Sequence, residues 1–176
     1  EITVPDGVWP TPDPLVRTMR VLANGMSIGT DKEGIHGHVV SVPSLEQLAK
    51  LGAEDKLQDS IVLYDWRSYT QYGLLSGPFR GEGAKEAAKY GANGVLIRSI
   101  APDGSTSGLH TGSMPDSPIP AACITQEDAE LITRLLGRGY LLRGKLTLPC
   151  KTLEPKTHRN IVFEIEGERK DEVVLI

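Results

Sequence analysis

The sequence predicts a β-rich α/β fold, and three observations indicate it. Short apolar or β-branched runs alternate with short amphipathic runs, as strands and helices do when they follow one another. Glycine and proline are frequent, at 19 and 12 residues, which favours short elements over long helical bundles. The 176 residues are 39% hydrophobic and 24% charged, a composition typical of one globular domain, or one domain with short pieces of a neighbour.

The first elements are predicted from side-chain pattern and punctuation. Residues 1–34 are rich in proline and glycine and read as an extended lead-in. His38–Val42 contains three valines and predicts a strand. Ser44 opens an S-x-x-Q capping box, which predicts a helix over 44–51. Ser60–Asp65 is a compact apolar run that suits a buried strand.

The later elements follow the same logic. Residues 101–120 hold repeated glycine and proline, and a loop of this length is more often functional than a mere connection. A second capping box begins at Thr125. The expected elements are a helix over 82–90, strands over 94–100 and 121–124, a helix over 126–137, a strand over 140–148, and two terminal strands over 160–166 and 172–176.

Charge and hydropathy exclude two classes of partner. The net charge is −4 and no stretch concentrates lysine and arginine, so nucleic acid is not expected as a partner. The apolar runs are far shorter than the roughly 20 residues that span a bilayer, so no membrane span is expected. The first residues lack a basic head and an apolar stretch, so a secretion signal is expected to have been removed or never present.

Three motifs have a functional and a plainer interpretation. His36 and His38 have a spacing that some metal sites use, but two exposed histidines entering a strand explain it as well. Gly81–Glu86 resembles the start of a phosphate loop but ends in glutamate where that motif has glycine, which favours a loop feeding a helix. Gly104–Gly108 has the glycine spacing of a nucleophile elbow, but its central residue is threonine.

Single residues leave further alternatives open. His110 either assists a nucleophile or makes a local hydrogen bond in its loop. Cys123 and Cys150 lie in separate predicted strands and either form a disulfide or remain two free thiols. The cluster Asp65, Trp66, Arg67 and Tyr69 follows a strand, where binding residues often lie, although a capped strand end is the plainer interpretation.

Taken together, several segments resemble one family. Three internal segments look like the protease-associated domain of the plasma glutamate carboxypeptidase (carboxypeptidase Q) group of zinc peptidases, and three others are similar to the flanks of that domain. The internal segments are Glu82–Ser99, His110–Gly112 and Ile119–Glu130, and the flanking ones are Ser27–Thr30, Asn160–Val162 and Glu172–Ile176.

The resemblance implies an architecture. It implies a protease-associated domain over 35–152, a β-sandwich or partly closed barrel flanked by two or three short helices. Residues 1–34 are then a lead-in from the peptidase side, and residues 153–176 are a linker and the first strands of a peptidase domain. In this family the strand matching 173–176 runs into an S-G-H-x-D segment with a zinc ligand, so the metal ligands and catalytic residues would lie beyond Ile176.

The resemblance also implies a function. The chain would be a non-catalytic region of a secreted or lysosomal exopeptidase, periplasmic or extracellular in a bacterium, that uses two zinc ions. It would cover or shape the substrate entrance through a loop with His110, Thr111 and Ser113, with no catalytic or metal residue and no cofactor of its own. Its partners would be the peptidase domain of the same protein and a peptide substrate, with a homo-oligomer left open. The family pattern has no counterpart of Cys150, so the disulfide with Cys123 is not implied.

Two other functions remain as alternatives. The same fold can serve as a stand-alone module that binds a peptide or a protein. A weaker hypothesis is a small enzyme that uses His110 or the pair His36 and His38.

Overall fold

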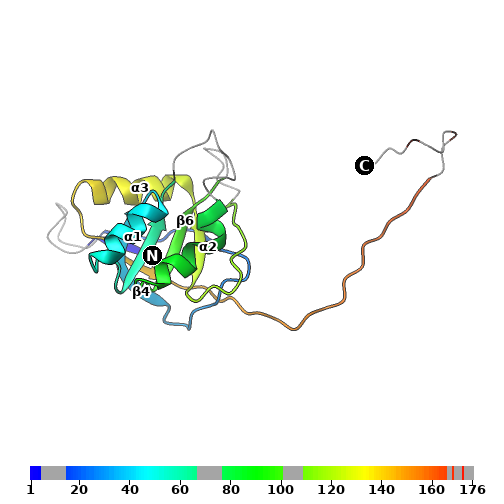
Figure 1. Cartoon of the computed structure of the whole chain (residues 1–176), viewed down its shortest axis with the longest axis horizontal. Coiled ribbons are helices and arrows are strands. Elements are labelled where there is room, and N and C mark those ends of the chain that lie inside the picture. Colours follow the sequence, from blue (N-terminus) through cyan, green and yellow to red (C-terminus); the bar gives the residue numbers. More distant parts are fainter. Residues whose placement is uncertain (5–14, 67–76, 101–108, 166–167, 169–171, 173–176) are drawn as a thin grey trace.

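The computed structural model describes residues 1–4, 15–66, 77–100, 109–165, 168 and 172, and within them the chain forms a mixed sheet with helices on both faces (Figure 1). The strands are β1 Ile2–Val4, β2 Leu15–Arg17, β3 Val21–Ala23, β4 Ile35–Val42, β5 Ser60–Tyr64, β6 Gly94–Arg98, β7 Ala121–Ile124 and β8 Arg143–Leu146. The helices are α1 Leu45–Ala53, α2 Gly77–Ala88 and α3 Gln126–Gly137.

The described strands form one eight-stranded sheet in the order β2-β1-β8-β4-β5-β6-β7-β3. The four central strands, β4 to β7, are parallel, and α1 and α2 make the crossovers from β4 to β5 and from β5 to β6. The outer strands are antiparallel to their neighbours. The carboxyl ends of the parallel strands therefore meet at one edge of the sheet.

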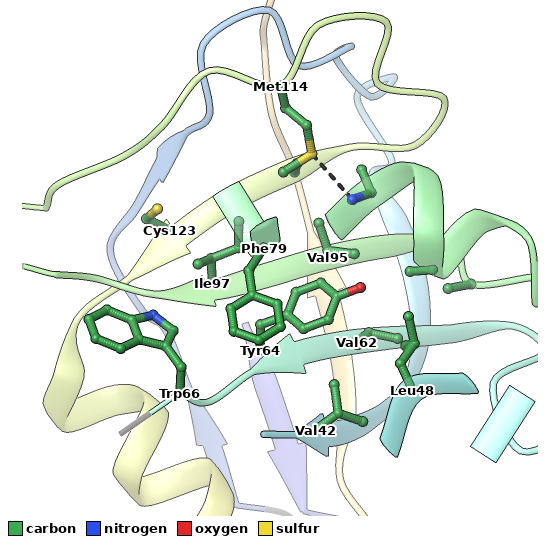
Figure 2. Close-up of a cluster of buried hydrophobic side chains, with 14 of the residues drawn as sticks. Val42, Leu48, Val62, Tyr64, Trp66, Phe79, Val95, Ile97, Met114 and Cys123 are labelled. Carbon is green, nitrogen blue, oxygen red and sulfur yellow. Dashed lines mark hydrogen bonds between the residues drawn. The ribbon is translucent and has the colours of Figure 1, made fainter. Parts of the chain in front are cut away.

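Two hydrophobic clusters hold the helices against opposite faces of this sheet. One contains Val62, Tyr64 and Ile97 of the strands together with Leu48 of α1 and Ala84 of α2 (Figure 2). The other contains the alternate strand residues and one face of α3, namely Val39, Ile61, Leu63, Leu96, Ala129, Ile132 and Leu135. Successive residues of a strand point to opposite faces, so strands buried on both sides read as continuous apolar runs.

The local signals explain two of the three helices. The Ser44 hydroxyl accepts a hydrogen bond from the Gln47 amide at 3.1 Å, and Thr125 does the same for Asp128 at 3.1 Å. Both predicted caps are thus confirmed, and α3 has its predicted bounds. By contrast, α2 begins at Gly77 and ends at Ala88, where the sequence predicted 82–90. A glycine and a proline can open a helix, but they read as breakers in the sequence.

The predicted architecture needs three corrections. The α/β class is confirmed, but the described strands form a single sheet and not a sandwich or a barrel. The sheet does not close on itself, because its two edge strands, β2 and β3, do not pair with each other. The lead-in 1–34 contributes three strands to this sheet. The strand predicted over 160–166 is absent from its described part, 160–165. The boundaries at 35 and 152 stay predictions.

Beyond Cys150 the chain leaves the body of the protein. Residues 151–165 run away from the sheet as an extended segment (Figure 1). Ile161, Val162, Phe163 and Ile165 are each at least 84% exposed. Among the described helices, none combines the length and apolar character that crossing a membrane requires.

Candidate functional site

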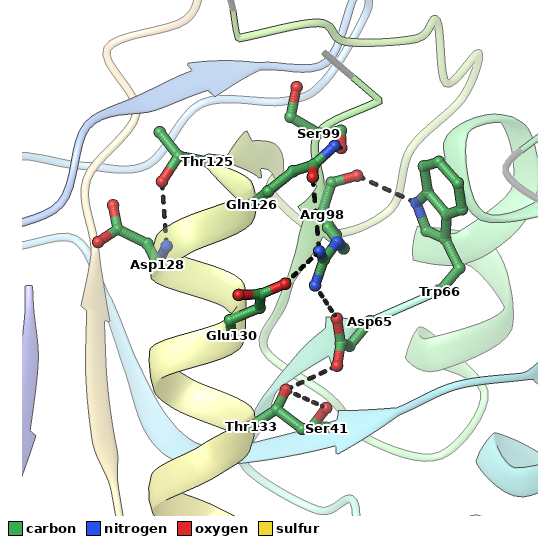
Figure 3. Close-up of polar contacts among 10 residues, drawn as sticks. All are labelled: Ser41, Asp65, Trp66, Arg98, Ser99, Thr125, Gln126, Asp128, Glu130 and Thr133. Carbon is green, nitrogen blue, oxygen red and sulfur yellow. Dashed lines mark hydrogen bonds and ion pairs between the residues drawn. The ribbon is translucent and has the colours of Figure 1, made fainter. Parts of the chain in front are cut away.

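Polar side chains gather at the edge where the parallel strands end (Figure 3). Asp65 directly follows β5, and Arg98 is the last residue of β6. Helix α3 brings Gln126, Glu130 and Thr133 over the same edge. In open α/β sheets, ligands bind outside the carboxyl ends of the strands. This edge is therefore the candidate site.

A buried arginine is the centre of the cluster. Arg98 is 3% exposed and its Nη1 lies 3.0 Å from Oδ1 of Asp65, which is 4% exposed. Its Nη2 lies 2.7 Å from Oε1 of Glu130. The Arg98 carbonyl accepts a hydrogen bond from the Trp66 indole at 3.1 Å. A charge is rarely buried unless it is paired, so these contacts fix the ends of β5 and β6 to α3.

A chain of hydroxyl groups extends this cluster toward β4. The Thr133 hydroxyl donates to Oδ2 of Asp65 at 2.9 Å, and the Ser41 hydroxyl lies 3.2 Å from Oγ1 of Thr133. A hydroxyl has one hydrogen, and that of Thr133 is given to the carboxylate, so Ser41 donates to Thr133. The lone pairs of the Ser41 oxygen are then left as acceptors.

A groove of about 530 Å³ lies beside this hydroxyl chain. Its walls are mostly apolar, and the carboxylate of Asp65 is already bound by Arg98 and Thr133. The groove is lined by Val39, Val40, Ser41, Pro43, Asp65, Thr133, Leu136 and Gly137. Such a lining suits an apolar group that carries a hydrogen-bond donor, and it offers no free charge to an ionic ligand.

The predicted entrance loop is held against β3 and α2. The Thr111 hydroxyl donates to Oδ1 of Asn24 at 2.8 Å, and Nη2 of Arg80 donates to the Thr111 carbonyl. The His110 amide donates to the Ser99 hydroxyl at 2.9 Å, just beyond β6. The structure therefore brings the beginning of this loop to the same edge as Arg98.

The side chains of the loop divide into exposed and buried ones. His110 and Ser113 are exposed, whereas Thr111 is half-buried. Met114 is fully buried, and its sulfur accepts a hydrogen bond from the Ala84 amide of α2 at 3.3 Å. The buried methionine anchors the loop and leaves His110 and Ser113 at the surface.

The two cysteines are free thiols, so the disulfide alternative is not the one that the structure adopts. Cys123 is buried in β7, and its thiol donates to Oδ1 of Asn24 at 3.3 Å. Burial raises the pKa of the Cys123 thiol to about 11, although Thr111 and Arg80 act in the opposite direction. Cys150 is partly exposed beyond β8.

The remaining sequence candidates do not join the site. His36 and His38 are both exposed on β4, and Nε2 of His38 lies 3.2 Å from the Lys56 carbonyl. Across the described ranges, no three His, Cys, Asp or Glu side chains are grouped so as to hold a metal ion. Gly81–Glu86 lies within α2, so it is neither a phosphate loop nor the loop feeding a helix that the plainer interpretation had. Gly104–Gly108, Arg67 and Tyr69 lie outside the described residues.

Sequence reasoning found Asp65 and Trp66 but missed the residues that complete the cluster. A signal for Arg98 was present, because a lone arginine in the apolar run Gly94–Ile100 must find a carboxylate if the strand is buried. No local pattern points to Ser41 or Thr133, which meet only because β4 and α3 pack together.

The fold is found among solved structures of peptidases. The structure of a peptidase M28 precursor from Shewanella amazonensis SB2B matches with a TM-score of 0.58 and 29% identity, over 84% of this chain and 33% of that one. An aminopeptidase from Aneurinibacillus sp. strain AM-1 matches with a TM-score of 0.53 and 18% identity, over 84% and 30% of the two chains, which shows likeness of fold alone.

A more particular similarity is to carboxypeptidase Q. The protein from Bos taurus is 38% identical over 170 residues, and that from Homo sapiens 36% over 170. Both matches cover 93% of this chain and 34% of the relative, so the chain spans about a third of the length of the curated relatives it matches. No family model matches the chain. The resemblance to carboxypeptidase Q that the sequence predicted is confirmed.

Proposed function

We propose that this chain is the protease-associated region of a di-zinc exopeptidase and that it shapes the substrate entrance without taking part in the chemistry. The observation that carries the proposal is the similarity to carboxypeptidase Q over 93% of the chain but only 34% of the relative. The proposed partners are the peptidase domain of the same protein and a peptide substrate. A secreted or lysosomal location belongs to the same proposal, as does a homo-oligomer.

Zinc would belong to the peptidase domain. Two zinc ions, when bound, would polarise a carbonyl and activate a water molecule. The described residues of this chain do not fit such a site, because none of their His, Cys, Asp and Glu side chains form a group of three around one point. No catalytic step is therefore assigned to them.

The entrance role is proposed for His110, Thr111 and Ser113. It is supported by the way in which Arg80 and Asn24 hold the backbone and hydroxyl of Thr111 while the neighbouring side chains remain exposed. A loop fixed at its base can present side chains to a substrate at low entropic cost.

Turnover of dipeptides by the purified chain in the presence of zinc tests the non-catalytic role. We expect no hydrolysis. Turnover that survives further purification would contradict the proposal. In a peptidase that contains this chain, His110→Ala combined with Ser113→Ala is expected to change KM more than kcat, because the loop touches substrate without reacting. His36→Ala, an exposed histidine of β4, is the matched control and should change neither.

A second candidate function is a stand-alone module that binds a peptide or a protein, and the groove beside Ser41 favours it. The two functions differ in the need for a peptidase domain. Mixing the chain with a carboxypeptidase Q that lacks the matching third should give a complex on size-exclusion chromatography if the first function holds. Separate elution of the two proteins would favour the module.

A further inference from the structure

Along one edge of β4, its last residues have no partner strand among the residues that the structure describes. The neighbouring strand β8 pairs with β4 only from Ile35 to His38, and one further hydrogen bond joins the Val39 amide to the Leu142 carbonyl at 2.9 Å. Before Leu142, the segment that joins α3 to β8 lies away from this edge of β4 and forms no strand with it. Edge strands usually protect such unpaired backbone groups.

The orientation of the backbone shows which groups face the open side. The Val42 carbonyl accepts from the Asp65 amide at 3.0 Å, so Val42 faces β5. Backbone groups of successive residues in a strand point to alternate sides, so the N–H and C=O of Ser41 point outward with those of Val39. No described residue pairs with Ser41 on that side.

The groove of about 530 Å³ runs along this same stretch of β4. Val39 and Ser41 form one wall, and Thr133, Leu136 and Gly137 of α3 form the other. The Ser41 hydroxyl donates to Thr133 and leaves its oxygen as an acceptor (Figure 3). An open strand edge and a side-chain groove therefore lie side by side.

We propose that this edge and groove form a binding site for an extended, uncharged peptide segment, which adds to the sheet beside Ser41 and places one small β-branched side chain against Leu136 and Thr133. Strand addition of this kind obtains affinity from main-chain hydrogen bonds and specificity from pockets for alternate side chains. The site needs no peptidase domain, so it is independent of the entrance role; it rests on the second candidate function, the peptide-binding module, and names the class of peptide that the module would take.

The chemistry of the walls selects the peptide. The peptide carbonyl would accept from the Ser41 amide, and a peptide amide would donate to the Ser41 carbonyl. Asp65 is 4% exposed and bound by Arg98, so a cationic side chain would be desolvated without gaining a carboxylate of its own. Valine suits the mostly apolar walls of the groove. Threonine is of similar size and can also donate a hydrogen bond to the acceptor oxygen of Ser41.

The test uses a fluorescent pentapeptide with blocked ends, in which a central valine is flanked by two threonines on each side. Binding to the whole chain is measured by fluorescence anisotropy. Two N-methylated forms of the peptide are compared. One is methylated at the amides of its first, third and fifth residues, and the other at the amides of its second and fourth residues. Only one edge of the peptide faces β4, so the two forms should differ in Kd by roughly tenfold.

A pair of glycine substitutions locates the site. A Cβ atom on Gly137 would meet no atom within 4 Å, and Gly137 lines the groove, so the ring of a phenylalanine there is expected to enter it. A Cβ atom on Gly81 of α2 is equally free, and Gly81 does not line the groove. Gly137→Phe should weaken binding by roughly tenfold or more, while Gly81→Phe leaves it unchanged. Circular dichroism checks that both variants keep their fold.

Three results would overturn the proposal. They are the absence of binding at millimolar peptide, equal affinities for the two N-methylated forms, and a Kd that Gly137→Phe leaves unchanged. Should Gly137→Phe fail to fold, Leu136→Asp carries the same expectation, because it places an unpaired charge in the groove wall.

Discussion

Arg98 is a guanidinium that the fold buries almost completely, and its two carboxylate partners differ in exposure. Asp65 is buried with it, whereas the Glu130 side chain is 53% exposed. Water screens the contact with Glu130, so Asp65 is the partner on which the buried charge depends. The cluster therefore has a structural role: it connects the ends of β5 and β6 to α3 beside the groove.

Replacing this arginine should destabilise the protein strongly. Arg98→Met removes the guanidinium that lies 3.0 Å from the buried Asp65 carboxylate, and breaking a buried pair costs about 3 to 5 kcal/mol. The free energy of unfolding in urea measures the loss. Lys89→Met removes an exposed contact with Glu86 and should have no measurable effect.

The double variant Asp65→Asn, Arg98→Met isolates the pair. Its loss of stability should be smaller than the sum of the losses of the two single variants, because both substitutions remove the same contact. Additive losses would show that Asp65 and Arg98 are not coupled in the folded state.

Cys123 should react slowly and Cys150 quickly. The thiolate is the reactive form, and burial raises the pKa of Cys123 from 9.0 to about 11. At pH 8, a thiol-specific reagent should modify Cys150 but not Cys123 in the native protein. In urea it should modify both. Two unreactive cysteines in urea without reductant would indicate a disulfide.

The same pKa predicts a dependence of stability on alkaline pH. The native thiol holds its proton more tightly than the unfolded one, so the contribution of Cys123 to the free energy of unfolding is fully present below pH 9.0. That contribution should be lost as the pH rises from 9.0 to about 11. Urea midpoints at pH 8 and pH 10.5, compared with those of Cys123→Ala, measure the contribution.

At the scale of elements, α2 lies unusually close to the sheet. The Tyr64 hydroxyl donates to the Gly83 carbonyl at 2.7 Å, and the Tyr64 ring stacks on Phe79 with centroids 4.9 Å apart. A Cβ atom on Gly83 would lie 2.7 Å from the Tyr64 ring. The glycine is thus required by a close approach of helix and strand.

Two glycines of α2 should respond in opposite directions to alanine. Gly83→Ala collides with Tyr64 and should destabilise by about 1 to 3 kcal/mol, as overpacking does. Gly81→Ala meets open space and should stabilise by up to about 1 kcal/mol through helix propensity. Thermal unfolding of the two variants compares them. Stabilisation by both would contradict the close packing.

The elements that could be predicted are those with a local cause. Ser44 and Thr125 cap their helices through bonds that span three residues, so the sequence showed both caps. The start of α2 was missed because it depends on packing of Phe79 against Tyr64, a distant residue. The site was half visible for the same reason: Asp65 follows a strand, but Ser41 and Thr133 meet through tertiary packing.

At the scale of the whole molecule, the order of strands was beyond sequence reasoning. The lead-in strands β1 and β3 pair with β8 and β7, more than 90 residues away. Short strands whose partners are so distant carry little local signal. The family resemblance was correct, but the sandwich or barrel inferred from it was not, since the described strands form one sheet.

The chain beyond the sheet should be the first part to be cleaved by a protease. Residues 151–165 are exposed and form no strand, and Lys156 and Arg159 lie within them. Proteases need an extended, accessible backbone, which helices and strands withhold. Brief trypsin treatment should cut here first, while Lys50 of α1 remains intact although it is exposed. Mass spectrometry of the early fragments identifies the sites, and a first cut at Lys50 would mean that α1 opens more readily than its packing implies.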